Sequence, residues 1–269
     1  MVRRTRLDAE LVRRGLARSR EHAAELVAAG RVRLRGTVAA KPAAMVDPAD
    51  PVHIEADQST EDYVSRGAHK LAGALDAFAP DRLSVAGRLC LDAGASTGGF
   101  TDVLLRRGAR SVIAVDVGYG QLAWSLRIDP RVTVLDRTNV RALTPEQLGG
   151  PVEVTVADLS FISLRLVLPA LVACTVPDGD VVPMVKPQFE VGRERVGKGG
   201  VVRDPMLRAR AVLDVAVAAA GLGLGVRGVT VSTLPGPSGN VEYFLWLRRD
   251  APAVDPALVA RVTGSGDDA

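Results

Sequence analysis

From about residue 63 onward, the chain alternates apolar, strand-like stretches with segments of helical periodicity. The strand-like stretches are residues 89–93, 112–116, 132–135, 152–158, 181–186, 226–231 and 241–247. Helical segments separate the first five, and strands connected through helices in this way pair in parallel. The sequence therefore predicts an α/β domain over residues 65–250 with a doubly wound, Rossmann-like sheet. Because ligands of such sheets bind at the carboxyl ends of the strands, we look for functional residues there.

The residues before this domain show a different pattern. Residues 6–15 and 19–30 carry apolar residues at helical spacing, and each stretch ends at a glycine, which predicts two short helices. Short strands are expected at residues 32–34 and 52–54. The sequence thus indicates a small α+β domain over residues 1–60.

Two further segments complete the predicted organisation. Residues 47–62 are rich in Asp, Pro, Ser and Thr, which is typical of a linker, and we expect the linker to run to about residue 64. Residues 251–269 end in a run of Gly, Ser and Asp, so they are expected to form a variable, partly disordered tail. The linker is not expected to contribute to a core.

Positive charge is concentrated at the front of the chain. Residues 1–46 contain eleven Lys and Arg and four acids, a net charge of +7, whereas the whole chain carries only +3, so the remainder is at −4. Basic side chains bind phosphates and release condensed counterions, which favours a phosphate-rich partner such as RNA. A solvated basic surface without a partner is the alternative that charge alone leaves open.

Several classes of protein are disfavoured by the composition. At 269 residues, with 47% hydrophobic and 24% charged residues, the chain has the composition of a folded soluble protein. Cys90 and Cys174 lie in apolar stretches, so we expect neither a disulfide framework nor a metal site, and a cytoplasmic location fits. The most apolar run, residues 211–226, is interrupted by Asp214 and three glycines, so no membrane span is expected. The N-terminal residues lack the apolar segment of a signal peptide.

A glycine-rich turn follows the first predicted strand of the α/β domain. It comprises Asp92, Gly94, Ala95, Ser96, Thr97, Gly98, Gly99 and Phe100. Glycines in such a turn let backbone N–H groups approach a ligand, and the N-terminus of the helix that follows adds positive potential. The spacing matches neither the dinucleotide fingerprint nor a P-loop, so we infer a cofactor that has an adenosine and a carboxylate. Tight packing of strand against helix would explain the glycines without any ligand.

Two polar residues after the next strands extend this predicted cofactor site. Asp116 ends the second strand, where a carboxylate can accept hydrogen bonds from both ribose hydroxyls. Asn139 follows the third strand and is expected to pair with the adenine edge. A turn role at the strand end is the structural alternative for Asp116.

Two charged residues end the fourth and fifth strands. Asp158 and Lys186 each terminate an apolar stretch, and the ends of neighbouring parallel strands bring them within reach of one another. A positioned lysine and carboxylate suit proton transfer or the stabilisation of a developing negative charge. A purely structural ion pair is the alternative, because a buried charge needs a partner in any case.

Several motifs, taken together and in order, resemble a known family. Four residues resemble the Lys-Asp-Lys-Glu tetrad of FtsJ-like 2′-O-ribose methyltransferases, namely Lys70, Asp158, Lys186 and Glu242. The glycine-rich turn is similar to their cofactor turn, and the segment from Arg6 to Arg33 resembles an S4 RNA-binding domain. Over nearly its whole length the chain closely resembles the hemolysin A (TlyA) family of ribosomal RNA methyltransferases.

The resemblance implies S-adenosyl-L-methionine as cofactor. It also implies 2′-O-methylation of cytidine in ribosomal RNA, at subunit-interface helices of the small subunit and also of the large. The four tetrad residues would be catalytic, with Asp158 also close to the cofactor. Lys186 would act either as a base or as a cation that stabilises the alkoxide, and the carboxylates would orient the lysines. We expect the protein to work as a monomer on ribosomal RNA in ribosomal subunits.

Basic residues outside the tetrad are expected to hold the RNA. In the front domain these are Arg4, Arg6, Arg18, Arg20 and Lys41, and in the α/β domain they are Arg66, Arg137, Arg193, Arg195 and Lys198. The last three lie in a glycine-rich segment, residues 192–200, that suits a mobile phosphate-binding lid; a plain flexible loop would have the same composition. Aromatic residues are scarce in the front domain, which favours recognition of helix shape and phosphates over stacked bases.

Two other functions compete with this prediction. A non-catalytic RNA-binding or ribosome-assembly protein with a degenerate methyltransferase domain is disfavoured by the intact glycine turn and tetrad. A membrane-active hemolysin, which the family name suggests, is disfavoured because the sequence has no cationic amphipathic lytic helix or membrane hairpin.

Overall fold

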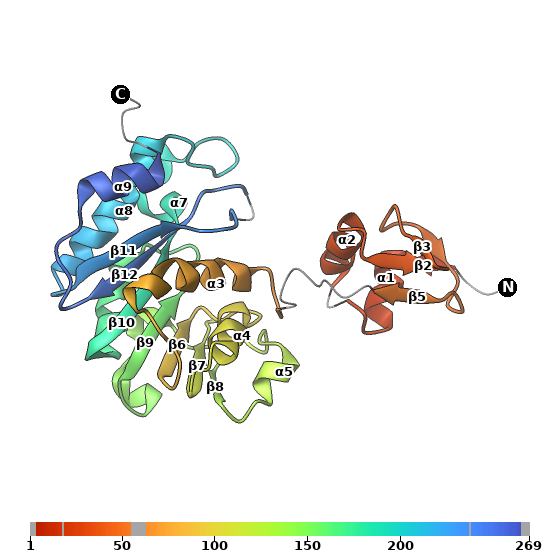
Figure 1. The fold of residues 1–269 in the computed structure, drawn as a ribbon, viewed down its shortest axis with the longest axis horizontal. Coiled ribbons are helices and arrows are strands. Elements are labelled where there is room, and N and C mark those ends of the chain that lie inside the picture. The colour runs from red at the N-terminus through yellow and green to blue at the C-terminus, as the bar shows by residue number, and fades with distance from the viewer. Residues whose placement is uncertain (1–3, 18, 55–62, 237, 265–269) are drawn as a thin grey trace. The chain divides into compact units, whose positions relative to one another are not determined.

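The computed structural model describes residues 4–17, 19–54, 63–236 and 238–264 of the chain, whose path is drawn in Figure 1. The chain divides into two compact units, residues 1–62 and residues 63–269. We name them the front unit and the sheet unit. Each has its own hydrophobic core.

The front unit contains two helices and several short strands. Its elements are β1 (Thr5–Arg6), α1 (Leu7–Arg13), α2 (Arg20–Ala28), β2 (Val32–Leu34), β3 (Thr37–Val38), β4 (Met45–Val46) and β5 (Val52–Ile54). Strand β2 pairs antiparallel with β3 and with β5, and β1 pairs antiparallel with β4. The two predicted helices and the two predicted strands are therefore confirmed.

Local signals in the sequence set the ends of these helices. Ser19 caps α2, because its hydroxyl accepts a hydrogen bond from the His22 N–H at 3.1 Å. Gly15 and Gly30, just beyond the helix ends, both adopt a φ of 70°, which glycine reaches without strain. The apolar faces of both helices then pack on the strands in one core, formed by Leu7, Leu11, Ala17, Ala23, Leu26, Val27, Val32, Ala39 and Val46.

The sheet unit contains a seven-stranded sheet with helices on both faces (Figure 1). Its strands are β6 (Leu89–Ala93), β7 (Ser111–Val115), β8 (Val132–Leu135), β9 (Val152–Ala157), β10 (Thr175–Val185), β11 (Gly225–Val231) and β12 (Tyr243–Arg248). Its α-helices are α3 (Gly67–Phe78), α4 (Gly99–Arg106), α5 (Trp124–Arg127), α6 (Leu164–Ala173), α7 (Pro187–Glu190), α8 (Pro205–Ala220) and α9 (Pro256–Thr263). Short 3-10 turns are η1 (Ala79–Asp81), η2 (Val140–Ala142), η3 (Pro145–Leu148) and η4 (Arg193–Arg195).

The sheet is mixed, whereas the alternation of strands and helices predicted a parallel one. The strand order is β11-β12-β10-β9-β6-β7-β8, and the pairs among β6 to β10 are parallel as expected. Strand β12 runs antiparallel to both of its neighbours. The reason is the connection from β11 to β12, which has no helix in its described residues, so the chain reverses instead of crossing over.

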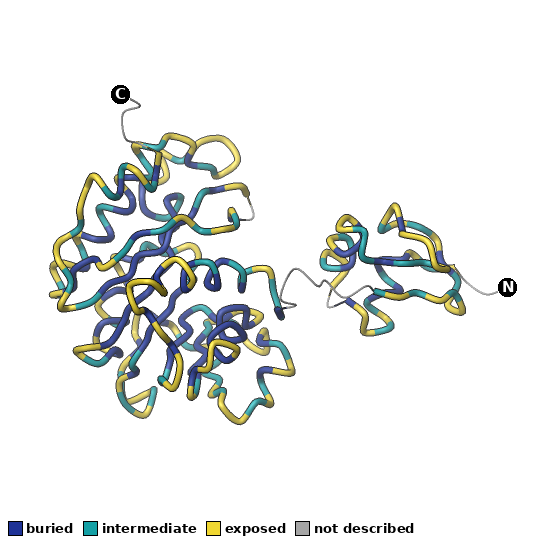
Figure 2. The backbone as a smooth tube through the Cα atoms, in the orientation of Figure 1, coloured by how far each residue is buried: buried dark blue, intermediate teal, exposed yellow. Residues whose placement is uncertain are grey.

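Two core layers cover the two faces of the sheet. One joins side chains of α6, α8 and α9 to the strands, and the other joins those of α3, α4 and α5. The deepest burial follows the central strands (Figure 2). Because both faces are covered, ligands can reach the strands chiefly at their ends, which is where the predicted functional residues lie.

The end of the chain is more ordered than the sequence suggested. Residues 256–263, which were expected to belong to a partly disordered tail, form helix α9, and Val259 is fully buried against the core. The expectation of disorder is therefore wrong for this segment, because Leu258, Val259 and Val262 give the helix an apolar face. Residues 265–269 lie outside the described part of the chain. Among the described residues, no helix combines the length and hydropathy that crossing a bilayer requires.

Candidate active site

Four charged residues that lie far apart in the sequence meet at one edge of the sheet. Lys186 follows β10, and Glu242 precedes β12, where Val185 is paired with Tyr243, so Lys186 and Glu242 stand opposite one another on neighbouring strands. Asp158 follows β9, which pairs with β10 through Ala157 and Pro183. Lys70 comes from α3. The sequence prediction that Asp158 lies beside Lys186 agrees with this geometry.

The lysines and acids form two separate ion pairs. Lys70 Nζ lies 2.6 Å from Glu242 Oε2, and both side chains are buried. Lys186 Nζ lies 2.5 Å from Asp158 Oδ1 and also donates a hydrogen bond to the Ser160 hydroxyl at 3.0 Å. The Lys186 side chain is 10% exposed and that of Asp158 24%, so this pair borders solvent, while the Lys70 pair lies deeper.

Glu242 has acceptor capacity to spare. Its Oε1 atom is buried and has no hydrogen-bond partner among the residues that the structure describes. Leaving a buried carboxylate oxygen unpaired is unfavourable, so such an atom marks a place where a water molecule or a ligand hydroxyl can donate a hydrogen bond. The edge of the sheet thus presents an ammonium group and a carboxylate oxygen close together.

The glycine-rich turn lies beside this edge, between β6 and α4. Gly94, Ser96 and Gly98 all have positive φ, at 89°, 48° and 97°. The N–H groups of Gly94 and Ala95 both donate to the Val115 carbonyl, which ties the turn to β7. A Cβ on Gly94 would lie only 2.5 Å from the Asp158 carbonyl oxygen, so the turn and the Asp158 loop are in close backbone contact. Any side chain here would push the two apart.

Asp92, the second-last residue of β6, is a buried carboxylate with an unpaired oxygen. Its Oδ2 accepts a hydrogen bond from the Thr101 hydroxyl at 2.7 Å, while its Oδ1 has no hydrogen-bond partner in the described chain. Burial raises the pKa of the Asp92 carboxyl to about 7, and the nearby carboxylates of Asp158 and Asp116 add to the effect. A positively charged ligand group at this turn would stabilise the ionised form.

The other two predicted cofactor residues lie along the same edge. Asp116 accepts hydrogen bonds from the Ser96 N–H at 2.8 Å and the Gly118 N–H at 2.7 Å, so it does hold the turn, as the structural alternative supposed. Each carboxylate oxygen keeps a further lone pair for a ribose hydroxyl. Asn139 is exposed after β8, and its Oδ1 accepts from the Arg141 N–H at 3.0 Å. These residues are placed where a nucleoside could lie, and their ligand roles remain predictions.

The glycines of the turn, Asp116 after β7 and the unpaired oxygen of Asp92 in β6 together fit S-adenosyl-L-methionine. The turn lets backbone N–H groups approach a ligand, and it has no room for a side chain at Gly94. The carboxylates of Asp116 and Asp92 can accept hydrogen bonds from ribose hydroxyls and from an amino group.

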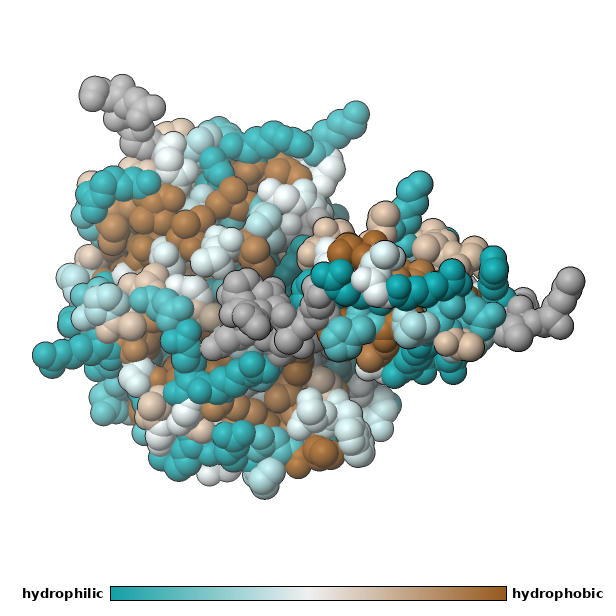
Figure 3. Space-filling view, turned by 45° about the vertical axis from the view of Figure 1, so that its right-hand side comes forward, coloured by the Kyte–Doolittle hydropathy of each residue, from teal (hydrophilic) through white to brown (hydrophobic). Residues whose placement is uncertain are grey.

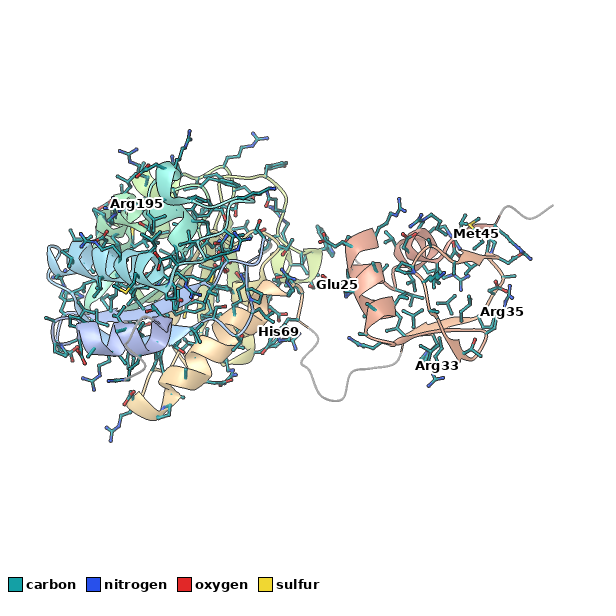
Figure 4. The ribbon with its side chains drawn as sticks, turned by 90° about the horizontal axis from the view of Figure 1, so that it is seen from above. Glu25, Arg33, Arg35, Met45, His69 and Arg195 are labelled. Atoms are coloured by element: carbon teal, nitrogen blue, oxygen red, sulfur yellow. The ribbon has the colours of Figure 1, made fainter. Side chains whose placement is uncertain are left out.

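The predicted RNA-binding residues of the sheet unit are all exposed. They are Arg66 at the start of α3, Arg137 after β8, and Arg193, Arg195 and Lys198 in the segment after α7 (Arg195 is labelled in Figure 4). The Arg137 guanidinium lies over the Tyr119 ring at 4.4 Å from its centre. The segment of the last three is partly structured, because it contains η4 and a bridge between Gly197 and Val201.

The predicted RNA-binding residues of the front unit also lie on its surface. Arg4, Arg6, Arg20 and Lys41 are exposed, whereas Arg18 falls outside the described residues. Hydrophilic side chains cover much of the visible face of this unit (Figure 3). Arg6 and Arg20 share one partner, since both bind Asp8.

An aromatic pair that was not expected from the sequence lies next to the Lys186–Asp158 ion pair. Phe161 is 92% exposed and has a φ of 63°, a conformation that costs energy for a bulky residue. Its ring centre lies 5.3 Å from that of Phe189, three residues after Lys186. A strained and solvent-exposed phenyl ring beside the lysine pair is suited to stacking on a planar ligand. Its position between Asp158 and the start of α6 gave no signal in the sequence.

Two further residues that the sequence did not single out hold the loops of the site. Glu190 accepts hydrogen bonds from the Ser163 hydroxyl at 2.6 Å and the Leu164 N–H at 2.7 Å, so it ties α7 to the end of the Asp158 loop. Asn240 accepts from the Val202 N–H at 2.9 Å and donates to the Gly200 carbonyl at 2.8 Å. Asn240, two residues before Glu242, therefore anchors the end of the glycine-rich segment 192–200. Both roles depend on contacts with residues far away in the sequence, which no local pattern shows.

Comparison with known proteins agrees with this site. The FtsJ-like methyltransferase model matches residues 63–249, and the S4 domain model matches residues 5–52. The "16S/23S rRNA (cytidine-2′-O)-methyltransferase TlyA" of Mycobacterium tuberculosis is 65% identical, over 97% of this chain and 95% of that protein. "Hemolysin A" of Brachyspira hyodysenteriae is 36% identical, over 89% and 98%. A solved structure of a Streptococcus thermophilus protein, described as a hemolysin candidate, is 38% identical with a TM-score of 0.76, over 98% and 96%.

Fold, site and comparisons together define an α/β methyltransferase whose parallel sheet is completed by an antiparallel strand. More narrowly, the chain belongs to the hemolysin A (TlyA) family of S4-domain, FtsJ-like methyltransferases.

Gly94→Ala should reduce the affinity for S-adenosyl-L-methionine at least about tenfold and lower the melting temperature, because the new Cβ would both strain the turn and displace the Asp158 loop. Gly87→Ala is the matched control: Gly87 has a φ of 72°, but a Cβ there would meet nothing within 4 Å. Calorimetric titration and thermal unfolding of both variants test this. Equal losses in the two would mean that backbone strain alone, and not contact with the Asp158 loop, matters.

Proposed function

We propose that this protein transfers a methyl group from S-adenosyl-L-methionine to the 2′-hydroxyl of a cytidine in ribosomal RNA. The observation that carries the proposal is the meeting of the Lys186–Asp158 and Lys70–Glu242 pairs at the sheet edge beside the glycine-rich turn. The proposed substrates are the small and the large ribosomal subunit, modified at interface helices by a cytoplasmic, monomeric enzyme. The 65% identity to the mycobacterial rRNA methyltransferase supports this substrate class.

The cofactor would be held by the turn and by the acids around it. The Gly94–Phe100 turn would hold its carboxylate through backbone N–H groups at the start of α4, and Asp92 would face its amino group, Asp116 its ribose and Asn139 its adenine. When bound, S-adenosyl-L-methionine supplies an electrophilic methyl group on a sulfonium centre. Asp158, in backbone contact with the turn, would lie between this cofactor and the lysine that it pairs with.

The chemistry asked of the protein is to orient a ribose hydroxyl and to handle its proton. A protonated hydroxyl is a weak nucleophile, so its proton would pass to a base, the unpaired Oε1 of Glu242, while negative charge builds on the hydroxyl oxygen. Lys186 would face this oxygen with its ammonium, held in place by Asp158 and Ser160. The unpaired Oε1 of Glu242, opposite Lys186, could accept a hydrogen bond from the hydroxyl, and Lys70 would balance the charge of Glu242.

The basic residues would position the RNA for this reaction. Arg4, Arg6, Arg18, Arg20 and Lys41 of the front unit and Arg66, Arg137, Arg193, Arg195 and Lys198 of the sheet unit are proposed to contact phosphates. Such contacts carry affinity and salt dependence but little sequence information. Placing one ribose at Lys186 requires the target nucleotide to leave its helix, as in other enzymes that act on a single nucleotide.

The direct test is to map 2′-O-methylated nucleotides on ribosomal RNA after incubating each purified subunit with the protein and S-adenosyl-L-methionine. New modification of cytidines, absent without enzyme, is the expected result. A titration that shows no cofactor binding at millimolar concentration, or a modified base instead of a ribose, would contradict the proposal. Subunits taken from a strain without the enzyme avoid prior modification.

Phe161→Ala should weaken methylation at limiting subunit concentration by roughly 5- to 150-fold, the effect of losing one aromatic–base stack. The exposed Phe161 ring can support the displaced base, and its ring contact is with Phe189 and not with a residue of the glycine-rich turn. Met206→Ala, which removes a side chain that is also exposed, at 64%, is the matched control and should have no effect. If Phe161→Leu retained full activity, simple apolar contact and not stacking would explain the ring.

A further inference from the structure

The front unit holds a nearly buried acid in the middle of its basic residues. Asp8 is 4% exposed although it lies in the first turn of α1, within the most positively charged part of the chain. Burying a carboxylate is unfavourable unless it is paired. The arginines beside Asp8 hold its pKa well below the usual range, so it is ionised under all working conditions.

Two arginines converge on this carboxylate from different elements. Arg6, at the end of β1, donates from Nε to Oδ1 at 3.1 Å and from Nη2 to Oδ2 at 2.8 Å. Arg20, at the start of α2, donates from Nη2 to Oδ2 at 3.1 Å. The backbone N–H of Ala9 completes the set at 2.8 Å. A single carboxylate thus holds the guanidinium groups of two arginines that belong to different elements, β1 and α2.

Both arginines keep donors directed away from Asp8. Their side chains remain 48% and 59% exposed, and each guanidinium has five N–H donors, of which the acid takes two from Arg6 and one from Arg20. Glu10, on the same helix, also binds two arginines, but both come from the C-terminal end of α1 itself. Arg13 binds Glu10 through two hydrogen bonds and its side chain is 61% exposed, whereas both Nη groups of Arg14 are used by the carbonyls of Asp50 and Pro48. Glu10 therefore joins arginines from one end of one helix, whereas Asp8 joins arginines from two elements.

We propose that Asp8 is a positioning residue that holds Arg6 and Arg20 together as a preformed clamp for an RNA phosphate. The clamp rests on the proposed function, because the phosphate belongs to the ribosomal RNA substrate. A guanidinium fork matches the oxygens of a phosphate, and two forks fixed in advance lose less side-chain freedom on binding than two mobile arginines.

The proposal and simple electrostatics predict opposite signs for one variant. Asp8→Asn removes a negative charge from a basic surface, so charge alone predicts tighter RNA binding. A positioning role predicts weaker binding, by about 5- to 30-fold, because two arginines must then be ordered at each binding event. Glu25→Gln is the matched control, since it makes the same charge change at an exposed acid of α2 (Figure 4). It should leave the affinity unchanged or raise it slightly.

The experiment measures the affinity of the full-length protein for purified ribosomal subunits at fixed salt, together with its melting temperature. The Asp8→Asn change is made in the wild-type protein and in an Arg6→Gln, Arg20→Gln background. We expect a loss in the first and almost none in the second, because without the arginines Asp8 has nothing to position. Equal losses in both backgrounds would assign Asp8 to folding alone, and equal or tighter binding by the single variant would overturn the clamp.

A second variant covers the outcome in which Asp8→Asn does not fold. Arg6→Lys leaves Asp8 in place and keeps the charge, but replaces the fork with a point charge, so binding should weaken severalfold. Wild-type affinity in Arg6→Lys would contradict the clamp. If the wild-type protein itself does not bind subunits, the proposed function fails first, and the clamp fails with it.

Discussion

Lys186→Ala should slow methyl transfer by about 10²- to 10⁴-fold, the range expected for loss of a positioned acid–base or charge-stabilising group. Cofactor and subunit binding should stay within a few-fold of wild type. The cofactor turn and the front unit do not depend on the Lys186 ammonium, which pairs with Asp158 and Ser160. Single-turnover methylation with enzyme in excess and subunit saturating isolates the chemical step from binding.

Two companion variants show what Lys186 supplies. Lys186→Arg should recover little activity, because a guanidinium has a different shape from an ammonium and Lys186 is buried. Ser160→Ala should cost much less than Lys186→Ala, since it removes one of the two groups that hold the amine and leaves the ion pair. Near-normal single-turnover rates in Lys186→Ala would mean that the residue is a structural ion-pair partner. The catalytic role would then move to Lys70.

Deletion of residues 1–60 should reduce methylation of ribosomal subunits by about 10²-fold or more. The deleted part contains the segment of net charge +7 and the proposed Asp8 clamp, and counterion release from such contacts supplies much of the affinity for RNA. The remaining unit keeps both of its core layers and the cofactor turn. It should therefore still fold and bind S-adenosyl-L-methionine, although more weakly if the linker contributes to the turn.

The truncation is tested with two readouts in parallel, subunit methylation and calorimetric cofactor titration. Loss of the first with retention of the second is the expected pattern. Undiminished turnover on subunits would refute the role of the front unit as an RNA anchor. Loss of cofactor binding together with a lower melting temperature would show instead that the sheet unit needs residues 1–60 in order to fold.

Much of the fold could be read from local patterns. The strand bounds at residues 89–93 and 132–135 agree with the sequence prediction, because a short apolar run between turn residues defines a strand over a few residues. The ends of α2 were equally local, set by Ser19 and Gly30. Helix α9 was missed because its apolar face is short and lies between polar residues, so only packing against the core reveals it.

The candidate site, like the fold, could be predicted only in part from the sequence. The residue types of the tetrad and the glycines of the cofactor turn could be named from the sequence, since a charged residue at the end of an apolar strand and glycines before a helix are short-range signals. Of their two pairings, the sequence predicted that of Asp158 with Lys186, which end neighbouring strands, but not that of Lys70 with Glu242. Lys70 pairs with Glu242 across 172 positions, and that pairing exists only because the antiparallel strand β12 returns beside β10.

The sequence by itself determined the two-part organisation of the chain, the positions of its strands and the kinds of side chain at the sheet edge, because these depend on composition and periodicity over a few neighbouring residues. Only the tertiary structure decided that Lys70 pairs with Glu242, that Asp8 joins arginines from two elements, and that Phe161 stands exposed beside Lys186. The physical reason is that contacts between distant segments follow from strand order and core packing, which no local pattern encodes.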